Sequence, residues 1–346
     1  MFNLIDKLYA TNSLTKDEFT ALIENRTPDL CEYAFKMADK VRKSIYGTDV
    51  YIRGLIEISN YCKNDCFYCG IRNSNKDLCR YRLTKEEILS CCDIGYPSGF
   101  RTFVMQGGED DAFSDDEMCD IVSAIKEKYP DCAVTLSLGE KSFSSYEKLK
   151  KAGADRYLLR HETATESHYK RLHPTSLSLE NRKRCLFDLK KLGFQVGSGF
   201  MVGSPFQTSE NLALDMLFLK ELNPQMVGIG PFIPHEKTPF RNFRAGDLEL
   251  TLFMVALTRL MLPKSLIPAT TALASLSPLG REMGLKAGAN VLMPNLSPPS
   301  KRELYSLYNG KASTGIEAQE GLEKLKEQVK NTGFEIVTDK GDYKNV

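Results

Sequence analysis

The chain has 346 residues, of which 42% are hydrophobic, 46 are basic and 45 are acidic, so its formal net charge is +1. This balance argues against binding to nucleic acid or to an anionic membrane surface, and no apolar run approaches the roughly 20 residues that cross a bilayer. The start, Met1–Lys7, lacks the basic and apolar segments of a signal peptide, which predicts a cytoplasmic protein. In that reducing compartment the ten cysteines are expected to be ligands or buried thiols rather than disulfides.

Residues 1–46 are predicted to form an N-terminal helical extension with two helices. The capping-box pattern Thr15-Lys16-Asp17-Glu18 begins the first helix. Thr27 and Pro28 begin the second helix, and Gly47 ends it. Cys31 within the second helix is interpreted as a small apolar core residue.

Residues 47–300 are predicted to form one α/β domain, because strand patterns alternate with amphipathic helices. Helix starts are indicated at Thr84, Ser114 and Ser178. Gly153, Gly193 and Gly288 are predicted to end helices just before the next strand. The expected strands are Tyr51–Ser59, Thr102–Gln106, Ala133–Leu138, Arg156–Arg160, Gln195–Met201, Met226–Pro231, Leu266–Thr270 and Asn290–Pro294. Eight units predict a complete (β/α)8 TIM barrel with its active site at the carboxyl ends of the strands.

Residues 301–346 are predicted to be a short C-terminal helical segment that packs on the barrel. A helix is expected from Glu317 to about Thr332. The residues after it are rich in Lys and Asp, a composition that favours fraying.

Three cysteines follow the first expected strand in a C-x3-C-x2-C pattern, at Cys62, Cys66 and Cys69. Their thiolates can bind three irons of a cubane iron–sulfur cluster, which leaves the fourth iron open to a small molecule. A structural zinc site completed by Cys79 or His161 is the alternative. The asymmetric 3-then-2 spacing matches no common zinc pattern, so the cluster is favoured.

This motif, with Tyr68 just before its last cysteine, resembles the signature of the radical S-adenosylmethionine (SAM) superfamily. The resemblance implies one 4Fe-4S cluster on the three cysteines, with SAM chelating the open iron. It also implies reductive cleavage of SAM to a 5′-deoxyadenosyl radical.

Further stretches resemble the SAM-binding motifs of that superfamily. Gly107-Gly108-Glu109 resembles the GGE motif, which implies contact with the SAM amino group. Gly197–Gly203 resembles the Gly-rich fifth strand, although Phe206 stands where a glycine is usual in the loop that follows. The resemblance implies a cofactor-binding set of Tyr68, Gly107, Gly108, Glu109, Ser137, Glu162, Arg182 and Met201. From the sequence alone, Arg182 fits a surface arginine equally well.

The polar run Arg160-His161-Glu162-Thr163 ends the fourth expected strand. Four consecutive polar side chains are poor core material, so a functional site is favoured there. The resemblance implies that Glu162 contacts SAM and that Arg160 faces the substrate. His161 is interpreted as a supporting residue behind the site.

Three later stretches, Val227–His235, Ile267–Ala272 and Gly288–Asn295, resemble the HydE family of FeFe-hydrogenase maturases. The resemblance, from about residue 30 to 310, implies action on a cysteine-bound iron carbonyl/cyanide precursor of the hydrogenase di-iron subcluster. HydG, HydF and an electron donor are then the implied partners. It also implies catalytic roles for Arg160 and Tyr305. The implied substrate or anion contacts are Arg160, Thr135, Met226, Thr270, Thr271, Tyr305 and Tyr308.

Two alternatives stay open: a carbon-skeleton mutase resembling methylornithine synthase, and an iron–sulfur scaffold that performs no SAM chemistry. No cysteine follows Cys185, so a second cluster is not expected, which also argues against biotin synthase. The other cysteines are interpreted as packing residues: Cys79, Cys91, Cys92, Cys119, Cys132 and Cys185.

Overall fold

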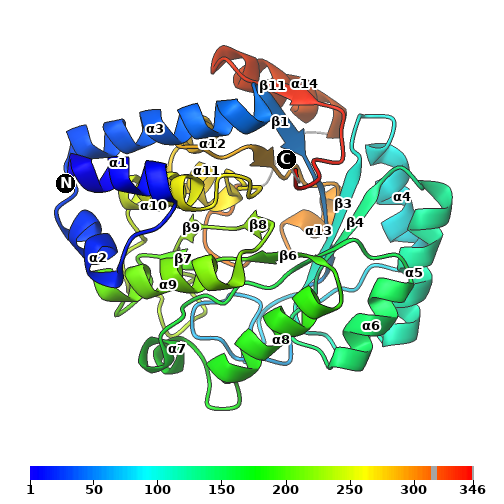
Figure 1. Cartoon of the computed structure of the whole chain (residues 1–346). Helices are drawn as coiled ribbons and strands as arrows, with labels where there is room; N and C mark the ends of the chain where they lie inside the picture. The colour runs from blue at the N-terminus through cyan, green and yellow to red at the C-terminus, as the bar shows by residue number, and fades with distance from the viewer. Residues whose placement is uncertain (313–317, 345–346) are drawn as a thin grey trace.

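The computed structural model describes residues 1–312 and 318–344. Its centre is a six-stranded parallel sheet, surrounded by helices (Figure 1). Along the sheet the order is β2 (Gly54–Ser59), β3 (Thr102–Gly107), β4 (Ala133–Ser137), β5 (Arg156–Leu158), β6 (Gln195–Ser198) and β8 (Met226–Val227). The buried strands are rich in Val, Ile and Leu, as expected of a parallel sheet covered by helices.

Two smaller parallel sheets extend this arrangement. One has the order β10 (Val291–Leu292), β1 (Asp49–Ile52), β11 (Glu335–Val337), and the other pairs β7 (Met201–Val202) with β9 (Gly230–Pro231). Isolated parallel bridges join Met226 to Leu266, Pro268 to Val291, and Leu55 to Asn295.

Some expected strands differ in the structure. The segment Leu266–Thr270 forms only isolated bridges, because Pro268 has no N–H to donate to a ladder. The strands expected at Gln195–Met201 and Met226–Pro231 are each divided into two short strands. Gly199 lies at the first division with φ +151°, and a Cβ there would come within 1.9 Å of the Gly228 carbonyl oxygen.

Three helices precede the barrel, where two were expected: α1 (Phe2–Thr11), α2 (Lys16–Glu24) and α3 (Pro28–Tyr46). Helix α1 begins without a side-chain cap, so the usual start signal is missing. It is held instead by its buried Ile5 and Leu8, which pack toward α10 (Leu248–Met261). The predicted Thr15 capping box and the Thr27 cap are both confirmed.

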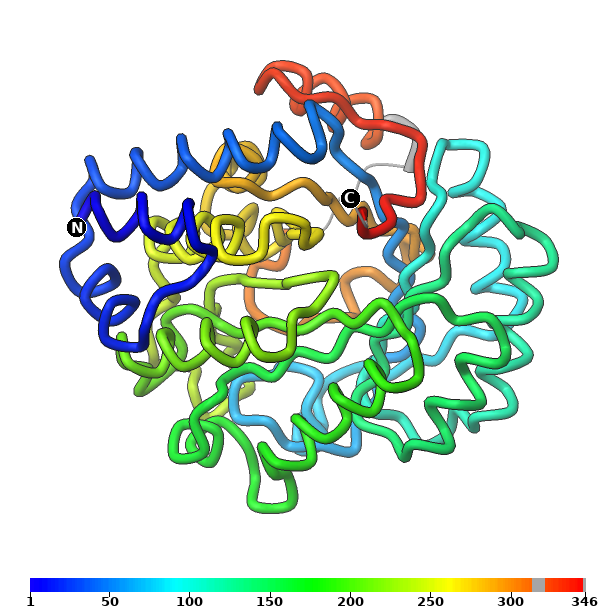
Figure 2. Tube along the Cα trace, in the orientation of Figure 1, coloured from blue at the N-terminus to red at the C-terminus, as the bar shows by residue number. Residues whose placement is uncertain are grey.

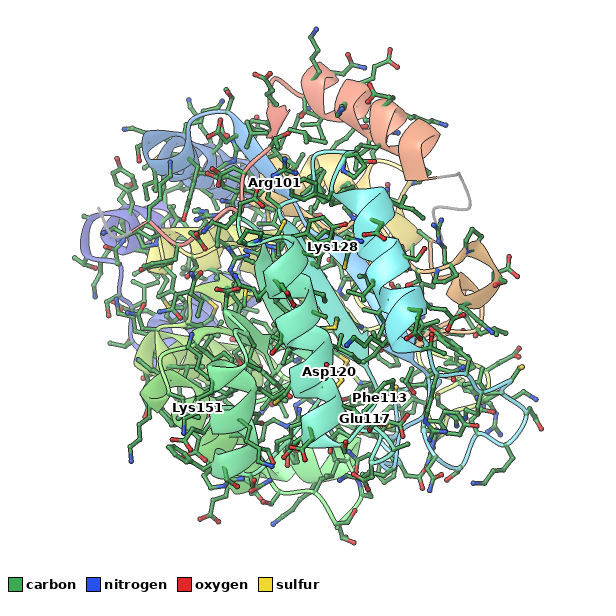
Figure 3. The ribbon with its side chains drawn as sticks, turned by 90° about the vertical axis from the view of Figure 1, so that its right-hand side faces the viewer. Arg101, Phe113, Glu117, Asp120, Lys128 and Lys151 are labelled. Atoms are coloured by element: carbon green, nitrogen blue, oxygen red, sulfur yellow. The ribbon has the colours of Figure 1, made fainter. Side chains whose placement is uncertain are left out.

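The remaining barrel helices are α4 (Lys85–Gly95), α5 (Asp115–Lys128), α6 (Phe143–Lys151), α7 (Glu166–Leu172), α8 (Leu179–Lys191), α9 (Ser209–Leu222), α11 (Thr271–Leu276) and α12 (Gly280–Lys286). The starts predicted at Thr84, Ser114 and Ser178 are confirmed as caps. Gly153, Gly193 and Gly288 follow helix ends with positive φ, as predicted. Figure 3 shows the outer face of α5, where Lys128 contacts Asp93 at 2.5 Å and Asp120 contacts Lys85 at 2.6 Å.

The C-terminal segment contains α13 (Pro299–Arg302), α14 (Ala318–Asn331) and β11. The helix expected from Glu317 is α14, and Glu317 itself lies outside the described residues. The expectation of fraying is wrong for the described tail, because β11 pairs with β1 and the chain continues under the barrel. Figure 2 shows this end of the trace returning to the strands.

The tail is held by a buried arginine at the amino ends of the strands. Arg156 NH2 donates to the Lys340 carbonyl at 2.9 Å and to Asp342 Oδ1 at 2.6 Å. Thr102 Oγ1 donates to the same carbonyl of Lys340 at 2.8 Å. A buried guanidinium needs acceptors, and the tail provides them.

All ten cysteines are free thiols. Most of those outside the C-x3-C-x2-C motif are buried as expected, but Cys79 is exposed, so its interpretation as a packing residue is wrong. Cys79 lies in the irregular segment between β2 and α4, where its neighbours Leu78 and Arg80 are only partly buried. No helix in the described part of the chain is both long and apolar enough to cross a membrane.

Candidate active site

A cavity of about 360 Å³ lies at the carboxyl ends of the strands. Residues from the ends of successive strands and from the loops that follow them converge on it, as they do at the active-site face of α/β barrels. Most of the predicted site residues line it: Cys62, Cys66, Tyr68, Cys69, Gly107, Gly108, Glu109, Ser137, Arg160, Glu162, Arg182, Met201, Thr270, Thr271, Tyr305 and Tyr308.

Thr135 and Met226 do not line this cavity. Thr135 lies two residues before the lining residue Ser137 on β4, and Met226 lies two residues before the lining residue Gly228, which follows β8. Both therefore lie deeper in the barrel than the cavity. Thr135 Oγ1 is buried without a hydrogen-bond partner. Met226 Sδ accepts from Arg53 NH1 at 2.8 Å.

The cysteine loop is fastened by backbone hydrogen bonds to three other segments. Lys63 N donates to Glu109 O at 2.9 Å, Phe67 N to Leu172 O at 2.9 Å, and Gly70 N to Leu307 O at 2.8 Å. Gly108 packs directly on this loop, since a Cβ there would lie 2.6 Å from Cys62 Cβ. The lack of a side chain at Gly108 therefore allows β3 and the cysteine loop to lie in direct contact.

The three cysteines of the loop are half-buried and line the cavity. Burial raises the pKa of Cys69 to about 12 and also raises the pKa values of Cys62 and Cys66. Such thiols become thiolates only beside strong positive charge, which the irons of a cluster provide. Among the described side chains, no three of His, Cys, Asp and Glu converge on one point as a single metal ion requires. The ligands of a cubane cluster each bind a different iron, so this spread is consistent with a cluster.

Tyr68 is held by a histidine on the far side of the loop. Its hydroxyl lies 3.1 Å from His173 Nε2, and His173 Nδ1 lies 3.0 Å from the Tyr169 carbonyl oxygen. Burial lowers the pKa of His173 to about 3, so the imidazole is neutral. The pair fixes the ring of Tyr68 against the cysteines.

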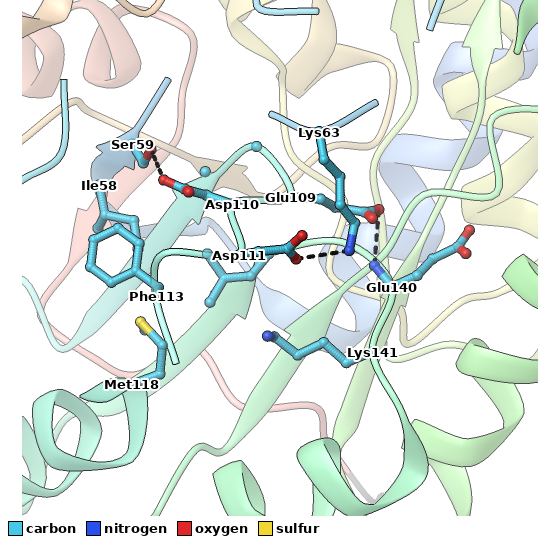
Figure 4. Close-up of a pocket in the computed structure, with 13 residues that line it drawn as sticks. Ile58, Ser59, Lys63, Glu109, Asp110, Asp111, Phe113, Met118, Glu140 and Lys141 are labelled. Atoms are coloured by element: carbon cyan, nitrogen blue, oxygen red, sulfur yellow. Dashed lines mark hydrogen bonds and ion pairs between the residues drawn. The ribbon is translucent and has the colours of Figure 1, made fainter. Parts of the chain in front are cut away.

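Glu109 reaches from the end of β3 to the end of β4. Its Oε1 accepts from the backbone N–H of Glu140 at 3.0 Å, beside a smaller hollow of about 30 Å³ (Figure 4). Gly139 has φ +77°, and a Cβ there would come within 2.0 Å of the Glu109 side chain. The glycine thus makes room for the carboxylate.

Arg182 enters the cavity from α8 and meets a carboxylate of the same wall. Its Nε donates to Glu140 Oε1 at 2.5 Å, and its NH1 donates to the Arg160 carbonyl at 3.2 Å. The alternative of a solvated surface arginine is therefore wrong, since Arg182 is buried.

Arg160 and Glu162 face each other with hydrogen-bonding capacity to spare. Arg160 NH2 lies 3.1 Å from Glu162 Oε2, yet neither atom has a hydrogen bond of good geometry, and Arg160 Nε is also unpartnered. Glu162 has φ +63°, a conformation that costs a non-glycine residue about 1 kcal/mol. Strained backbone and unpartnered polar atoms occur together at ligand-binding sites, so this pair of residues is a candidate binding site.

His161 points away from the cavity. It is fully buried between Phe200 and Phe218, with Nδ1 2.9 Å from Ser198 Oγ and Nε2 3.4 Å from Asp215 Oδ1. Burial lowers its pKa well below the usual value. Its contacts are those of a neutral residue that supports the loop from behind.

A polar group at the inner wall was not predicted from the sequence. Lys311 Nζ contacts Glu57 and donates to the Tyr305 carbonyl at 2.9 Å. Asn295 Nδ2 donates to Glu57 Oε2 at 2.9 Å, and Gln106 Nε2 donates to Tyr305 OH at 3.3 Å. Glu57 could have been found, because a charged residue interrupts the apolar strand Leu-Ile-Glu-Ile. Lys311 gave no signal in its polar surroundings.

Phe206 keeps the loop shape for which a glycine is usual. Its φ is +69°, which is the left-handed conformation that glycine adopts easily. The ring of Phe206 stacks against Arg171, whose Cζ lies 3.4 Å from the ring centroid. This cation–π contact offsets the conformational cost of the left-handed backbone.

Residues 56–219 match the model of the radical SAM superfamily. The cavity suits the cofactors of that superfamily, since three thiols, unpartnered acceptors and guanidinium groups line one chamber. The protein is therefore a radical SAM enzyme. It is 53% identical over 280 residues to the [FeFe] hydrogenase maturase subunit HydE of Thermotoga maritima, covering 81% of this chain and 80% of that protein. The chain belongs to the HydE family.

Two further comparisons concern methylornithine synthase. The 3-methylornithine synthase of Methanosarcina barkeri is 29% identical over 309 residues, 89% of this chain and 87% of that protein. The crystal structure of methylornithine synthase (PylB) matches with a TM-score of 0.84 at 26% identity, covering 96% of this chain and 97% of that one. The radical SAM α/β fold with a parallel central sheet is thereby confirmed.

Proposed function

We propose that this protein acts in assembly of the FeFe-hydrogenase di-iron subcluster, on a cysteine-bound iron carbonyl/cyanide precursor. The proposal rests on one observation: the three cysteines of the loop and the guanidinium of Arg160, two of whose nitrogens have no hydrogen-bond partner, line one cavity. An anionic organometallic complex fits such a site, because a guanidinium offers several fixed donors. HydG, HydF and an electron donor are the proposed partners, in the cytoplasm.

Cys62, Cys66 and Cys69 would hold one 4Fe-4S cluster, with no second cluster because no cysteine follows Cys185. Bound SAM and this cluster together supply the 5′-deoxyadenosyl radical. We assign cofactor contacts to Tyr68, Gly107, Gly108, Glu109, Ser137, Glu162, Arg182 and Met201. Glu109 and Glu162 offer carboxylates to an ammonium group, and Arg182 offers a guanidinium to a carboxylate.

The substrate is assigned to the deeper part of the chamber. Arg160 Nε and Thr270 Oγ1 are buried without partners there, which supports anion binding by Arg160, Thr270 and Thr271. Tyr305 and Tyr308 close the chamber from the C-terminal segment, and Tyr305 is the proposed catalytic partner of Arg160. Thr135 and Met226 would act from one layer below.

We also infer that the barrel is complete. The chain is then divided into an N-terminal helical extension (1–46), the barrel (47–300) and a C-terminal segment (301–346). The bridges of Leu266 and Pro268 to the neighbouring strands support a seventh unit, and the Leu55–Asn295 bridge supports closure between the eighth and the first. A closed wall excludes water and stray hydrogen donors from a reactive radical.

The test is hydrogenase activation in an anaerobic mixture of apo-hydrogenase, HydF and HydG, with and without this protein. We expect hydrogen evolution that requires this protein and is lost with Cys66→Ser. Cys79→Ser is the matched control, because Cys79 is exposed and does not line the cavity.

A mutase resembling methylornithine synthase is the second candidate, favoured by the close match in fold. Intact SAM cleavage without any hydrogenase activation would reject the maturase and favour this mutase. A scaffold without SAM chemistry is set aside by membership of the radical SAM enzymes.

A further inference from the structure

An exposed patch of aromatic rings and arginines lies beside the cysteine loop. We call it the aromatic–arginine patch and define it by Phe206, Phe243, Arg171, Arg241 and Arg244. Phe206 and Phe243 are 42% and 38% exposed, with ring centroids 5.3 Å apart. Exposed aromatic rings in contact are unusual on a surface that meets only water, and they are typical of protein interfaces.

The arginines of the patch are exposed and lack acidic partners. Arg171 stacks on Phe206 at 3.4 Å, while Arg241 and Arg244 flank Phe243 in the turn that carries it. Within the described part of the chain, none of the three lies within 4.0 Å of a carboxylate oxygen. Nearby Lys170 and Lys237, by contrast, are paired with Glu166 and Asp77. Unpaired guanidinium groups around an apolar centre predict an acidic partner.

A chain of ring contacts leads from the patch to the cysteines. The centroids of Phe243 and Phe240 are 5.3 Å apart, and those of Phe240 and Phe67 are 6.1 Å apart. Phe67 directly follows Cys66 in the loop. A partner seated on the patch would therefore lie close to the cluster that we assign to this loop.

The neighbouring surface is hollowed on the same side. A groove of about 430 Å³ runs between residues 74–77, just after the cysteine loop, and residues 236–241. Lys76, Lys237 and Arg241 line it, together with Asp77 and Glu236. The groove thus extends from Arg241 of the patch to the segment that follows the cysteine loop.

We propose that the aromatic–arginine patch is the docking site of a small acidic one-electron carrier protein that reduces the cluster. The transfer moves one electron from the carrier to the cluster and neither forms nor breaks a bond. The proposal rests on the cluster position given under the proposed function. Because redox encounters bury small interfaces, a few charges around an aromatic centre suffice to steer and hold the carrier.

Binding is the first readout. Fluorescently labelled bacterial ferredoxin, an acidic iron–sulfur carrier, is titrated with the cluster-loaded protein and followed by anisotropy. The triple variant R171E/R241E/R244E is expected to weaken binding at least tenfold at low salt. The matched control K36E/K286E/K324E changes the net charge equally at exposed lysines with no carboxylate partner among the described residues, and should change the Kd less than twofold.

Salt dependence sharpens this comparison. Binding by the wild type should weaken steeply as salt is added, because surface charges are screened, whereas the patch variant should respond little. Equal weakening in the patch and control variants would overturn the proposal, since net charge alone would then explain binding.

Reduction is the second readout. With reduced ferredoxin as the sole reductant, SAM cleavage by the patch variant should fall at least tenfold, and with dithionite it should stay within twofold of wild type. F243S should show the same selective loss, in smaller measure. A fall with both reductants would overturn the proposal, because the substitutions would then damage the site itself.

The competing occupant is a partner maturase. If binding of HydG depended on the three arginines while binding of ferredoxin did not, the patch would belong to the maturase and the proposal would be wrong. Neither readout uses hydrogenase or an organometallic substrate. A failure of the maturase assignment therefore leaves this test intact, and the reverse also holds.

Discussion

Arg156 and Arg160 lie four residues apart at opposite ends of the same strand segment and meet opposite surroundings. The Arg156 guanidinium is fully buried and donates to Thr102, to two tail carbonyls and to Asp342. The Arg160 guanidinium faces the cavity, and two of its nitrogens have no hydrogen-bond partner. A buried cation whose two terminal nitrogens donate to its own chain, as those of Arg156 do although its Nε has no partner, holds the fold together, whereas Arg160, with two nitrogens unpartnered, is available to a ligand. The predictions below test this contrast between the two ends of the barrel.

The largest effect is expected at the cysteine loop. Cys66→Ser should abolish the iron–sulfur absorbance and all SAM cleavage, because an alcohol does not replace a thiolate ligand. The urea midpoint of the apoprotein should stay unchanged, since the loop is fastened by backbone hydrogen bonds. Retained SAM cleavage would contradict the ligand assignment.

Arg160→Ala should reduce turnover of the true substrate about 100-fold, because loss of a buried charge contact typically costs a few kcal/mol. Uncoupled SAM cleavage, measured as 5′-deoxyadenosine released, should fall less than threefold. Arg160→Lys should recover little, since a lysine lacks the planar fork. If turnover and SAM cleavage fell equally, Arg160 would belong to the SAM site.

Glu162→Ala should weaken SAM binding about tenfold, as expected for loss of a charged hydrogen bond. Glu162→Gly should weaken SAM binding equally. Its free energy of unfolding, however, should be about 1 kcal/mol higher than that of the alanine variant, because the backbone angle of φ +63° favours glycine. Titration calorimetry with SAM and urea unfolding measure the two effects separately. Unchanged SAM affinity in both variants would refute the contact.

The smallest effect is expected at the amino ends of the strands, where Arg156 pairs with Asp342. Arg156 lowers the pKa of Asp342 to about 2, against about 3.9 in an unfolded chain. This depressed folded-state pKa stabilises the protein above about pH 4, and the stabilisation is lost as the pH falls toward 2.

Asp342→Asn should therefore cost about 1 kcal/mol at pH 7, a value reduced for the partial exposure of Asp342. The difference from wild type should vanish near pH 2. Urea unfolding of the apoprotein at both pH values measures it, and SAM cleavage per folded molecule should not change. A difference that persisted at pH 2 would mean that the ion pair is not its cause.

The sequence predicted those features whose signals are local. The caps at Thr84 and Ser114 and the glycines that end helices are read within one turn of chain, and all are confirmed. The parallel strands were predicted because their buried runs are nearly continuous. The division near Gly199 depends on the neighbouring backbone of Gly228, which no local pattern reports. The loss of the strand at Pro268, by contrast, follows from a residue within the segment, because a proline has no N–H for a ladder.

The site was predictable where a motif carries it. The cysteines were found by their spacing, Gly107–Glu109 by resemblance to a family motif, and Arg160 and Glu162 as polar residues after a strand. All of these residues line one cavity. Lys311 and Asp342 were missed because their roles arise only when a distant segment meets the barrel. A lysine or an aspartate in a polar tail looks like any solvated residue until its buried partner, Glu57 or Arg156, is known.

The pairing of β1 with β11, which places Asp49 opposite Glu335, also has a consequence for biosynthesis. Ribosomes add about 5–20 residues per second, so Arg156 emerges roughly 10–40 s, and the edge of β1 roughly 15–60 s, before residues 335–342 can cover them. During that interval a nascent chain exposes an unpaired strand edge and a bare cation, features that invite premature association with other chains. We therefore expect the amino end of the barrel to be completed last and to be the part that most needs a chaperone.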